Sequence, residues 1–462
     1  MKRDLDGIIG EFKQGLDRVG GGDFERRIGA ELKFPLVAAD GSAAPRAAVD
    51  ALWAFLIESC GWSGETDPGT GRLVGAHLSG PRNETVASCE TGYCKTEFSL
   101  AHAGDLAELG SILDRVRADV LRFAGQEGVR FLAYGIHPVT PPGRDLLMKK
   151  ERAGFWDRAL PSNAVIPPER GDDVHLFTVN AGSHVHVAVR PDEAVPLVNA
   201  LNGLTGAQIA LMGHSSVWRG EADPDHLAIS EVLWDWWPRA AGRCGVPARP
   251  FADVDDYVRA ITALVPIYAK RPEGPVILTD HASFLDYFSA ERATGRMIDG
   301  TEVAVEPCEA DLALHNSCYW YDARISRYYT VENRACDQQP VDALLAPAAM
   351  TLGLAENLAG ASELVARYSW DDLRASRDAA IRDGLRARVG DCVLADLAAA
   401  TLACAEAGLR ARGRGEECHL APLAARLERG ENPADEARAL FRAGGISGLL
   451  AARTLTPITE NP

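Results

Sequence analysis

The most informative segment of this chain reads Tyr321-Asp-Ala-Arg-Ile-Ser-Arg-Tyr-Tyr-Thr-Val-Glu-Asn-Arg-Ala-Cys-Asp337. Within it, Thr330, Glu332 and Arg334 alternate along a predicted strand, so their side chains project from one face. A hydroxyl, a carboxylate and a guanidinium that share one strand face suggest a ligand site. A structural ion pair between Glu332 and Arg334 is the alternative, because residues two apart on a strand are neighbours on the same face.

Two further segments favour the ligand site. The segment Gly182-Ser-His184-Val-His186-Val-Ala-Val-Arg190 places two imidazoles on one strand face and apolar residues on the other. The segment Glu90-Thr-Gly-Tyr-Cys-Lys-Thr-Glu97 places two carboxylates on either side of a predicted turn. Carboxylates and histidines on several strands form a donor set for a divalent metal ion.

Composition indicates one large catalytic unit, or two closely packed ones. The chain has 462 residues, 47% of them hydrophobic, and a formal net charge of -17. Such an acidic chain is not expected to bind nucleic acid or anionic lipid, because phosphate binding requires clustered Lys and Arg. The ten cysteines are scattered, and the closest pair, Cys89 and Cys94, has four residues between its members. We therefore expect reduced thiols rather than a metal finger.

The chain shows no run of about 18 apolar residues, and its amino terminus lacks the apolar stretch of a signal peptide. We therefore expect a cytoplasmic protein whose partners are small-molecule substrates rather than membranes or nucleic acids. A homo-oligomer is left open. An anionic substrate needs a local basic pocket, for which Arg324, Arg327, Arg334 and the run Lys149–Arg152 are candidates. Such a run is equally typical of a solvated helix face.

The pattern along the chain predicts an α+β fold. Helical spacing alternates with short strand-like segments; helices are expected over residues 5–16, 47–60, 105–127, 191–212 and 254–264, and extended segments over 25–38, 85–99 and 129–137. Polar residues at alternate strand positions imply a sheet with one face open to a site and the other covered by helices. We predict a curved, mostly antiparallel sheet with helices on one face.

The carboxy-terminal part differs in kind, since residues 341–452 are rich in Ala, Leu and Arg with helical spacing. We therefore predict a catalytic α+β domain over residues 1–340 and a helical C-terminal layer over 341–462, packed on the same unit. No P-loop, dinucleotide fingerprint or Gly-x-Ser-x-Gly elbow occurs in the chain. Nucleotide binding would therefore use another mode.

Five motifs in order resemble the glutamate-cysteine ligase family, including its bacterial carboxylate-amine ligase branch. They are Gly29-Ala-Glu31, Glu90 to Glu97, Tyr134-Gly-Ile-His137-Pro, His184-Val-His186 and Thr330-Val-Glu332-Asn-Arg334-Ala-Cys-Asp337. The resemblance implies a glutamine-synthetase-like fold whose active site lies on the concave face of a curved antiparallel sheet. It also implies that ATP and Mg²⁺ activate a substrate carboxylate as an acyl phosphate for attack by an amine.

The resemblance also implies roles for single residues. Glu31, Glu90, Glu97 and Glu332 match acids that bind magnesium. His186 matches a polar position that faces the metal and the nucleotide phosphates, and His184 is a second candidate on the same face. Arg334 matches the arginine that neutralises the transferring phosphoryl group, with Arg327 as an assistant. The implied metal ligands are thus Glu31, Glu90, Glu97, Glu332 and His186, the nucleotide-binding residues His184, His186 and Arg334, and the catalytic residues Arg334, Glu332 and Arg327.

Two departures from the family pattern bear on the substrates. The first motif usually continues Glu-x-Glu, whereas this chain has Glu31-Leu-Lys33, which places a cation where a metal ligand is expected. One metal ion is therefore expected to be lost or weakened. In the later Ser-x-Arg segment, Ser230 stands where an arginine is expected, unless Arg219 replaces it. That arginine would help to hold an anionic substrate group.

These observations leave three hypotheses. The leading one is an ATP-dependent ligase that forms a γ-glutamyl amide, with glutamate and cysteine as its substrates. The second is a diverged amide-forming ligase of specialised metabolism that uses another amino acid or amine. The third is a catalytically inactive relative that binds a nucleotide or amino acid and acts as a regulator.

Overall fold

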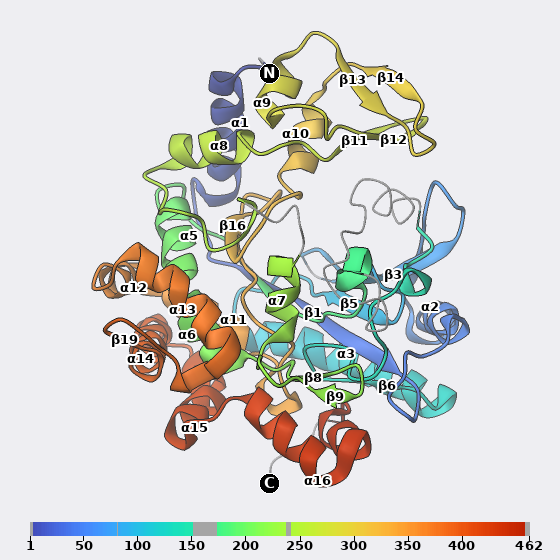
Figure 1. Cartoon of the computed structure of the whole chain (residues 1–462), viewed down its shortest axis with the longest axis vertical. Coiled ribbons are helices and arrows are strands. Elements are labelled where there is room, and N and C mark those ends of the chain that lie inside the picture. Colours follow the sequence, from blue (N-terminus) through green and yellow to red (C-terminus); the bar gives the residue numbers. More distant parts are fainter. Residues whose placement is uncertain (1–2, 81, 151–172, 237–241, 458–462) are drawn as a thin grey trace.

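A nine-stranded sheet runs through the centre of the molecule (Figure 1). The computed structural model describes residues 3–80, 82–150, 173–236 and 242–457. The strands of this sheet are β1 (Ile28–Val37), β2 (Ser63–Thr66), β3 (Leu73–Ser79), β4 (Glu84–Cys89), β5 (Lys95–Ser99), β6 (Arg130–Phe131), β7 (Ser183–Val187), β16 (Ala323–Ile325) and β17 (Val331–Asn333).

The strand order is β16-β17-β7-β1-β5-β4-β3-β2, with β6 paired to the far end of β1. Every pairing in this sheet is antiparallel. The predicted antiparallel α+β fold is therefore confirmed. The expected strand over residues 129–137 is shorter than predicted, because only β6 pairs in a regular ladder there.

The alternation of β1 separates an apolar face from a polar face. Ala30, Leu32 and Phe34 belong to the hydrophobic core, whereas Glu31 and Lys33 project to the opposite face. The helices that contact these strands are α2 (Arg46–Cys60), α3 (Leu106–Glu127), α5 (Ala194–Gly203) and α11 (Ala346–Glu356). Helices thus pack against the sheet, as predicted, and its polar side chains gather on the face opposite the apolar one.

The helices near the sheet begin and end where local signals predict. Asp105 caps α3, since its carboxylate accepts a hydrogen bond from the backbone N–H of Glu108, and Gly128 ends that helix with a left-handed backbone at φ 70°. The helix expected over residues 191–212 is divided at Leu204 into α5 and α6 (Thr205–Met212). The next helix in the chain after α6 is α7 (Ile229–Trp236).

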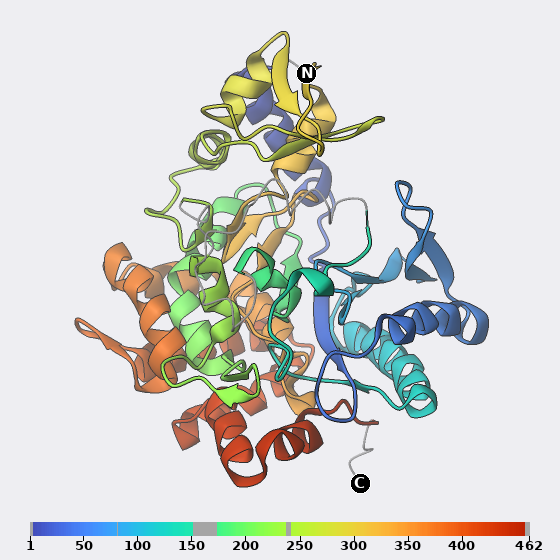
Figure 2. The same cartoon turned by 45° about the vertical axis from the view of Figure 1, so that its right-hand side comes forward.

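A smaller α/β part sits at one end of the molecule, next to the amino terminus (Figure 1). It contains a second, four-stranded antiparallel sheet with short helices. Its elements are α1 (Leu5–Gly20), α8 (Val254–Thr262), β11 (Tyr268–Arg271), β12 (Gly274–Ile277), α9 (Phe284–Ser289), β13 (Ala293–Arg296), β14 (Glu302–Val305) and α10 (Glu309–His315). Figure 2 shows the central strands between this part and the carboxy-terminal helices.

The carboxy-terminal region is helical apart from one short hairpin, as predicted. Its elements are α11, α12 (Leu358–Val365), α13 (Trp370–Asp383), β18 (Arg388–Val389), β19 (Cys392–Val393), α14 (Leu394–Arg412), α15 (Ala421–Arg429) and α16 (Pro433–Arg453). Helix α11 contacts β1 and β7, so these helices pack on the same unit as the sheet. The division into a domain of residues 1–340 and a layer of 341–462 stays a prediction.

Short elements complete the chain between these parts. They are the hairpin β8 (Val217–Trp218) and β9 (Glu221–Ala222), the parallel pair β10 (Cys244–Gly245) and β15 (Trp320–Tyr321), and the 3-10 helices η1 (Arg144–Leu146), η3 (Asp173–Thr178), η4 (Val341–Ala343), η5 (Gly384–Arg386) and η6 (Glu416–Leu420). Gly92, in the turn between β4 and β5, is needed for packing, since a Cβ there would stand 2.0 Å from the carbonyl oxygen of Thr178.

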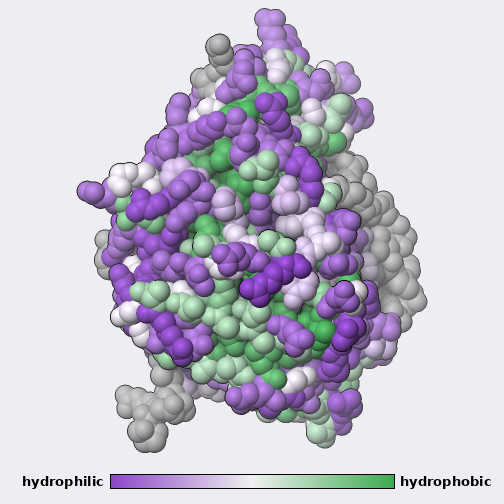
Figure 3. All heavy atoms as spheres, turned by 90° about the vertical axis from the view of Figure 1, so that its left-hand side faces the viewer, coloured by the Kyte–Doolittle hydropathy of each residue, from purple (hydrophilic) through white to green (hydrophobic). Residues whose placement is uncertain are grey.

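The surface of the described residues is mixed in polarity. Figure 3 shows hydrophilic residues over much of one face, with hydrophobic residues in separate areas between them. Val19 and Tyr328 are the large apolar side chains that are exposed in the described part. No single helix among the described residues is long and apolar enough to cross a membrane. Two pairs of helices, each joined by a sharp bend, reach that length and composition only when both helices are counted together: α5 with α6, and the segment 341–356 with α12.

Buried histidines predict a pH-dependent stability. Burial lowers the pKa of His137 to about 4 and those of His184 and His315 to about 3. These imidazoles are therefore neutral in the folded protein, whereas the unfolded chain takes up protons below about pH 6.5. Because the unfolded state binds more protons there, the contribution of these three histidines is complete above that pH and is lost as the pH drops towards 4. His137 alone accounts for about 3 kcal/mol of this loss. Glu97 and Asp337 act in the opposite direction, since burial raises the pKa of each to about 7 and the folded state takes up their protons first.

Urea unfolding at a series of pH values between 7 and 4.5 tests this expectation. Relative to the unaltered protein, His315→Gln should gain stability as the pH falls through this range, because it lacks one imidazole that is neutral only in the folded state. An equal pH dependence of the free energy of unfolding in the two proteins would contradict it.

Candidate active site

Polar side chains from adjacent strands converge on the polar face of the central sheet, where most of them are buried. Glu332 lies directly opposite His186, and Glu31 lies directly opposite His184. Lys33 lies opposite Glu97 on the next strand. Directly opposed residues in an antiparallel sheet project to the same face, so strand pairing alone brings these side chains together. The predicted strand faces of the two histidines and of Glu332 are confirmed.

Lys33 is at the centre of this group. Its Nζ lies 3.2 Å from Oε2 of Glu31, 3.2 Å from Oε2 of Glu97 and 3.1 Å from Nδ1 of His184. The residue is 2% exposed. Burial by itself lowers the pKa of Lys33, but Glu97, Glu90 and Glu31 outweigh it and raise that pKa above its ordinary value. The site therefore contains a buried, charged ammonium group.

A second buried lysine holds Glu90. The Nζ of Lys95 lies 3.4 Å from Oε2 of Glu90 and donates hydrogen bonds to the backbone oxygen of Phe177 and the side-chain oxygen of Asn180, both at 3.1 Å. Burial opposes ionisation of Glu90, yet Lys33 and Lys95 together lower its pKa. For Glu97 the balance is reversed, since burial and the charge of Glu90 raise its pKa to about 7.

Two arginines enclose Glu332. The Nε of Arg324 donates to Oε2 at 2.7 Å, and the Nη1 of Arg334 donates to Oε1. Burial raises the pKa of Glu332, but the two guanidinium groups reverse this and hold the pKa well below its ordinary value. Arg334 also lies over the ring of Trp234, with 5.8 Å between the guanidinium carbon and the ring centroid. Its orientation is thus fixed from two sides.

The two histidines have opposite electrostatic surroundings. Burial, Lys33 and Arg334 lower the pKa of His184 to about 3, so its imidazole is neutral at pH 7. His186 lies 3.3 Å from Oε1 of Glu31 through its Nε2, and 3.0 Å from the hydroxyl of Thr330 through its Nδ1. Burial lowers the pKa of His186, but Glu31 and the nearby Glu332 outweigh it and raise that pKa.

One group of side chains has the geometry of a metal site. Glu31, His186 and Glu332 each offer a ligand atom, and these atoms lie within 4.8 Å of one another. Carboxylate oxygens with one imidazole fit Mg²⁺ or Mn²⁺ chemically. Among the described residues, Glu90 and Glu97 do not join this group; they contact lysines instead. Their role as metal ligands stays a prediction.

The cluster is balanced in charge when all its carboxylates are ionised and both histidines are neutral. Its four acids and four bases are Glu31, Glu90, Glu97 and Glu332, and Lys33, Lys95, Arg324 and Arg334. Removing the carboxylates around Lys33 or Lys95, or the guanidinium groups around Glu332, would leave a buried charge uncompensated, which is costly in a low-dielectric environment.

Some predicted residues lie elsewhere. Arg327 is exposed in the turn between β16 and β17, where its guanidinium lies 4.7 Å from the ring centroid of Tyr328. Arg324, another of the basic candidates, lies inside the cluster, where it contacts Glu332. Ser230 is buried and donates its backbone N–H to the hydroxyl of Ser215. Arg219 lies at the β8–β9 turn, with its guanidinium carbon 4.0 Å from the ring centroid of Trp218. The end of the Lys149–Arg152 run lies outside the described residues.

Sequence reasoning missed Lys95 altogether. Lys95 lies inside the Glu90–Glu97 motif, two residues before Glu97 on the predicted extended segment. Because residues two apart on a strand share a face, this spacing could have placed Lys95 on the same face as Glu97.

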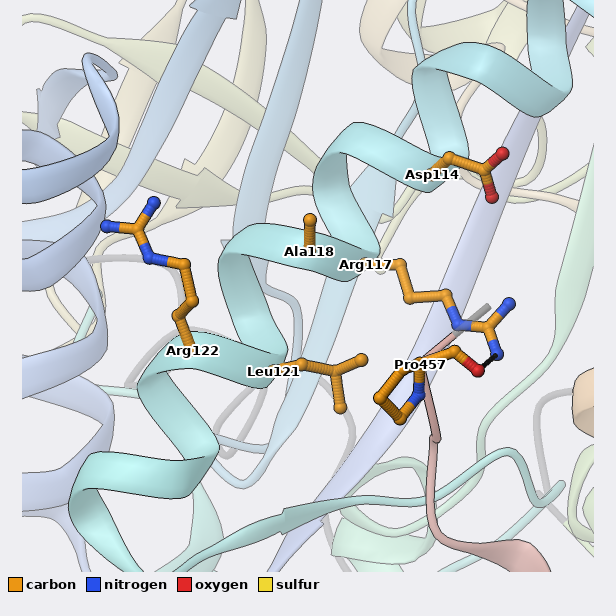
Figure 4. A pocket seen from close by; sticks show the side chains of 6 residues that line it. All are labelled: Asp114, Arg117, Ala118, Leu121, Arg122 and Pro457. Carbon is orange, nitrogen blue, oxygen red and sulfur yellow. Dashed lines mark hydrogen bonds between the residues drawn. The ribbon is translucent and has the colours of Figure 1, made fainter. Parts of the chain in front are cut away.

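Two cavities among the described residues lie apart from this cluster. One of about 350 Å³ lies between α3 and Pro457, where the guanidinium of Arg117 donates to the Pro457 carbonyl at 3.0 Å (Figure 4). Another of about 590 Å³ is lined by α7 and α13 residues, including Arg377. Neither is lined by a residue of the charge cluster, so the site is recognised by its chemistry rather than by its cavity.

Comparison with known proteins identifies the family. The sequence model of glutamate-cysteine ligase family 2 matches residues 27–452. The chain belongs to this family. The matched range contains every residue of the charge cluster, and the resemblance inferred from the five motifs is confirmed.

Among curated relatives of this glutamate-cysteine ligase family 2 member, a putative glutamate–cysteine ligase 2-2 of Mycolicibacterium vanbaalenii is 30% identical over 184 residues. The match covers 40% of this chain and 46% of that relative, so the chain spans less than half the length of this relative. Among solved structures, a glutamate–cysteine ligase from Francisella tularensis in complex with AMP has a TM-score of 0.48 at 10% identity, covering 93% of this chain and 87% of that chain. A bifunctional glutathione synthetase from Pasteurella multocida has a TM-score of 0.40 at 12% identity, covering 96% and 52%.

The buried and exposed arginines next to β16 offer a matched test of the charge cluster. Replacing Arg324 by Gln removes a buried partner of Glu332, and we expect the free energy of unfolding to fall by about 3 kcal/mol. Replacing Arg327 by Gln changes an exposed side chain, and we expect a change below about 0.5 kcal/mol. Chemical denaturation of both variants measures the difference. Equal effects would mean that Arg324 is not part of a buried charge network.

Proposed function

We propose that this chain is an ATP-dependent carboxylate–amine ligase that forms a γ-glutamyl amide, with glutamate as donor and cysteine as acceptor. Membership of glutamate-cysteine ligase family 2 supports this class of reaction. The observation that carries the proposal is the convergence of Glu31, His186 and Glu332 beside Arg334 on the polar face of the sheet. This arrangement combines metal-binding donors with a fixed guanidinium.

The proposed reaction has two steps. An oxygen of the substrate carboxylate attacks the γ-phosphorus of ATP, ADP leaves with the electron pair of the broken bond, and an acyl phosphate forms. The amine then attacks the acyl carbon, phosphate leaves, and the nitrogen loses a proton. The first step brings two anions together, so positive groups must offset their repulsion before reaction.

The residues of the charge cluster would have different roles in this reaction. Arg334 is the candidate catalytic residue, since a guanidinium carries five N–H donors and spends one of its nitrogens on Glu332. The remaining donors suit phosphoryl oxygens. Glu332 and Trp234 position the guanidinium, and Arg324 holds Glu332 from the other side. A bound magnesium ion, held by Glu31, His186 and Glu332, would supply further positive charge to the phosphates.

A diverged acceptor or donor is the second candidate, and two positions favour it. Lys33 and Ser230 both differ from the family pattern, and Ser230 bonds inside the protein to Ser215 rather than offering a cation. A site without that cation would hold an anionic substrate group less tightly, which favours a different amino acid or amine.

Turnover measurements test the proposed activity. We expect purified protein with ATP and magnesium to release ADP with glutamate and cysteine, confirmed by the mass of the γ-glutamyl product. Release with another pair only would favour the diverged ligase, and no release with any donor and amine would overturn the proposal.

Arg334 can be tested against a matched control. We expect Arg334→Lys to lower kcat about 100-fold, because lysine cannot reproduce the planar set of donors. Arg327→Lys, a change in the exposed turn, serves as the control, and circular dichroism confirms the fold of both. Unchanged turnover in Arg334→Lys would remove this residue from the mechanism.

A further inference from the structure

The position of Lys33 has a consequence for the number of metal ions. On β1 the side chains of Glu31 and Lys33 share one face, and the Lys33 ammonium is equally distant, at 3.2 Å, from a carboxylate oxygen of Glu31 and one of Glu97. A divalent ion that bridged these two carboxylates would need the same space. Magnesium also requires oxygen ligands at about 2.1 Å, which the lysine prevents.

This ammonium is built into the fold. Lys33 is 2% exposed, and its backbone N–H donates to the side-chain oxygen of Gln338. Removing a buried ammonium from its carboxylates would leave those charges unpaired, so the side chain cannot be displaced at low cost. Glu97 supports this view, because its Oε2 is buried and makes no hydrogen bond, which leaves the Lys33 charge as its compensation.

We propose that the Lys33 ammonium takes the place of a divalent ion between Glu31 and Glu97, so that the site accepts a single exchangeable divalent cation, at Glu31, His186 and Glu332. The inference rests on the proposed function only for the idea that the site uses divalent ions. A lysine contributes one positive charge where a divalent ion contributes two, and it is present whether or not metal is available.

The balance of the cluster sets how that single ion binds. Because four acids already face four bases, a divalent ion adds uncompensated positive charge. Its binding should therefore be weak alone and stronger with an anionic ligand such as a nucleoside triphosphate. Linkage requires the same factor in both directions, so the ion should strengthen binding of the triphosphate equally.

Counting bound Mn²⁺ tests the proposal without any turnover. Electron paramagnetic resonance of free Mn²⁺, titrated against the full chain with no nucleotide present, gives the number of ions bound at saturation. We expect one per chain for the unaltered protein, and no bound ion at saturation would contradict the site at Glu31, His186 and Glu332. The variant Lys33→Glu restores a carboxylate on the same strand face, and we expect it to bind at least one more.

Lys33→Met is the matched control, because it removes the charge, keeps a similar volume and adds no ligand. It should bind no more Mn²⁺ than the unaltered protein. Thermal denaturation gives a second readout: Mn²⁺ should raise the Tm of Lys33→Glu by more than it raises the Tm of Lys33→Met. If Lys33→Glu folds only with metal present, its Mn²⁺-dependent refolding supports the proposal.

Two further outcomes overturn the inference. The first is two or more Mn²⁺ ions on the unaltered protein, which decides the question even without variants. The second is an equal count and an equal Mn²⁺ effect on Tm in Lys33→Glu and Lys33→Met. Failure of the ligase assay with every substrate pair would overturn the proposed function. The number of bound Mn²⁺ ions would still decide the inference about Lys33, because that measurement needs no turnover.

Discussion

The ion pairs of the buried Lys33 ammonium with Glu31 and Glu97 are the constraint on which the polar face of the sheet depends. An ammonium group removed from water costs several kcal/mol unless carboxylates surround it. Its partners lie on β1 itself and on β5, so the pairing also specifies the register of these two strands. A slip of one residue would turn Lys33 towards the apolar core and Leu32 towards the site.

The same electrostatics connect stability with the proposed chemistry. Arg334 is fixed by Glu332, which is in turn held by Arg324, so the guanidinium that would meet a phosphoryl group is oriented before any substrate binds. Preorganised positive charge is effective because it needs no rearrangement during reaction. The fixed ammonium of Lys33 extends this arrangement, since it supplies charge without depending on the metal supply.

The sequence predicted much of this site through the period of two along a strand. That period placed His184 with His186, and Glu332 with Arg334, on shared faces; the two histidines face one side of β7, and Arg334 contacts Glu332. It did not reveal which residue of the next strand stands opposite. The family resemblance gave Arg327 a role beside Arg334, and the turn after β16 leaves Arg327 exposed, whereas Arg324 contacts Glu332. The same resemblance assigned Glu90 and Glu97 to metal, and the assembled sheet places them beside Lys95 and Lys33.

The sequence by itself determined the class of fold, the family, and the set of acids, histidines and arginines that carry the proposed chemistry, because these follow from local periodicity and motif order. Only the tertiary structure decided which charges neutralise one another. That choice depends on strand order and register, which join β1, β5, β7, β16 and β17 across about 300 residues of chain. The partner of a buried charge is therefore a property of the assembled sheet, and the sequence could show only that a partner was needed.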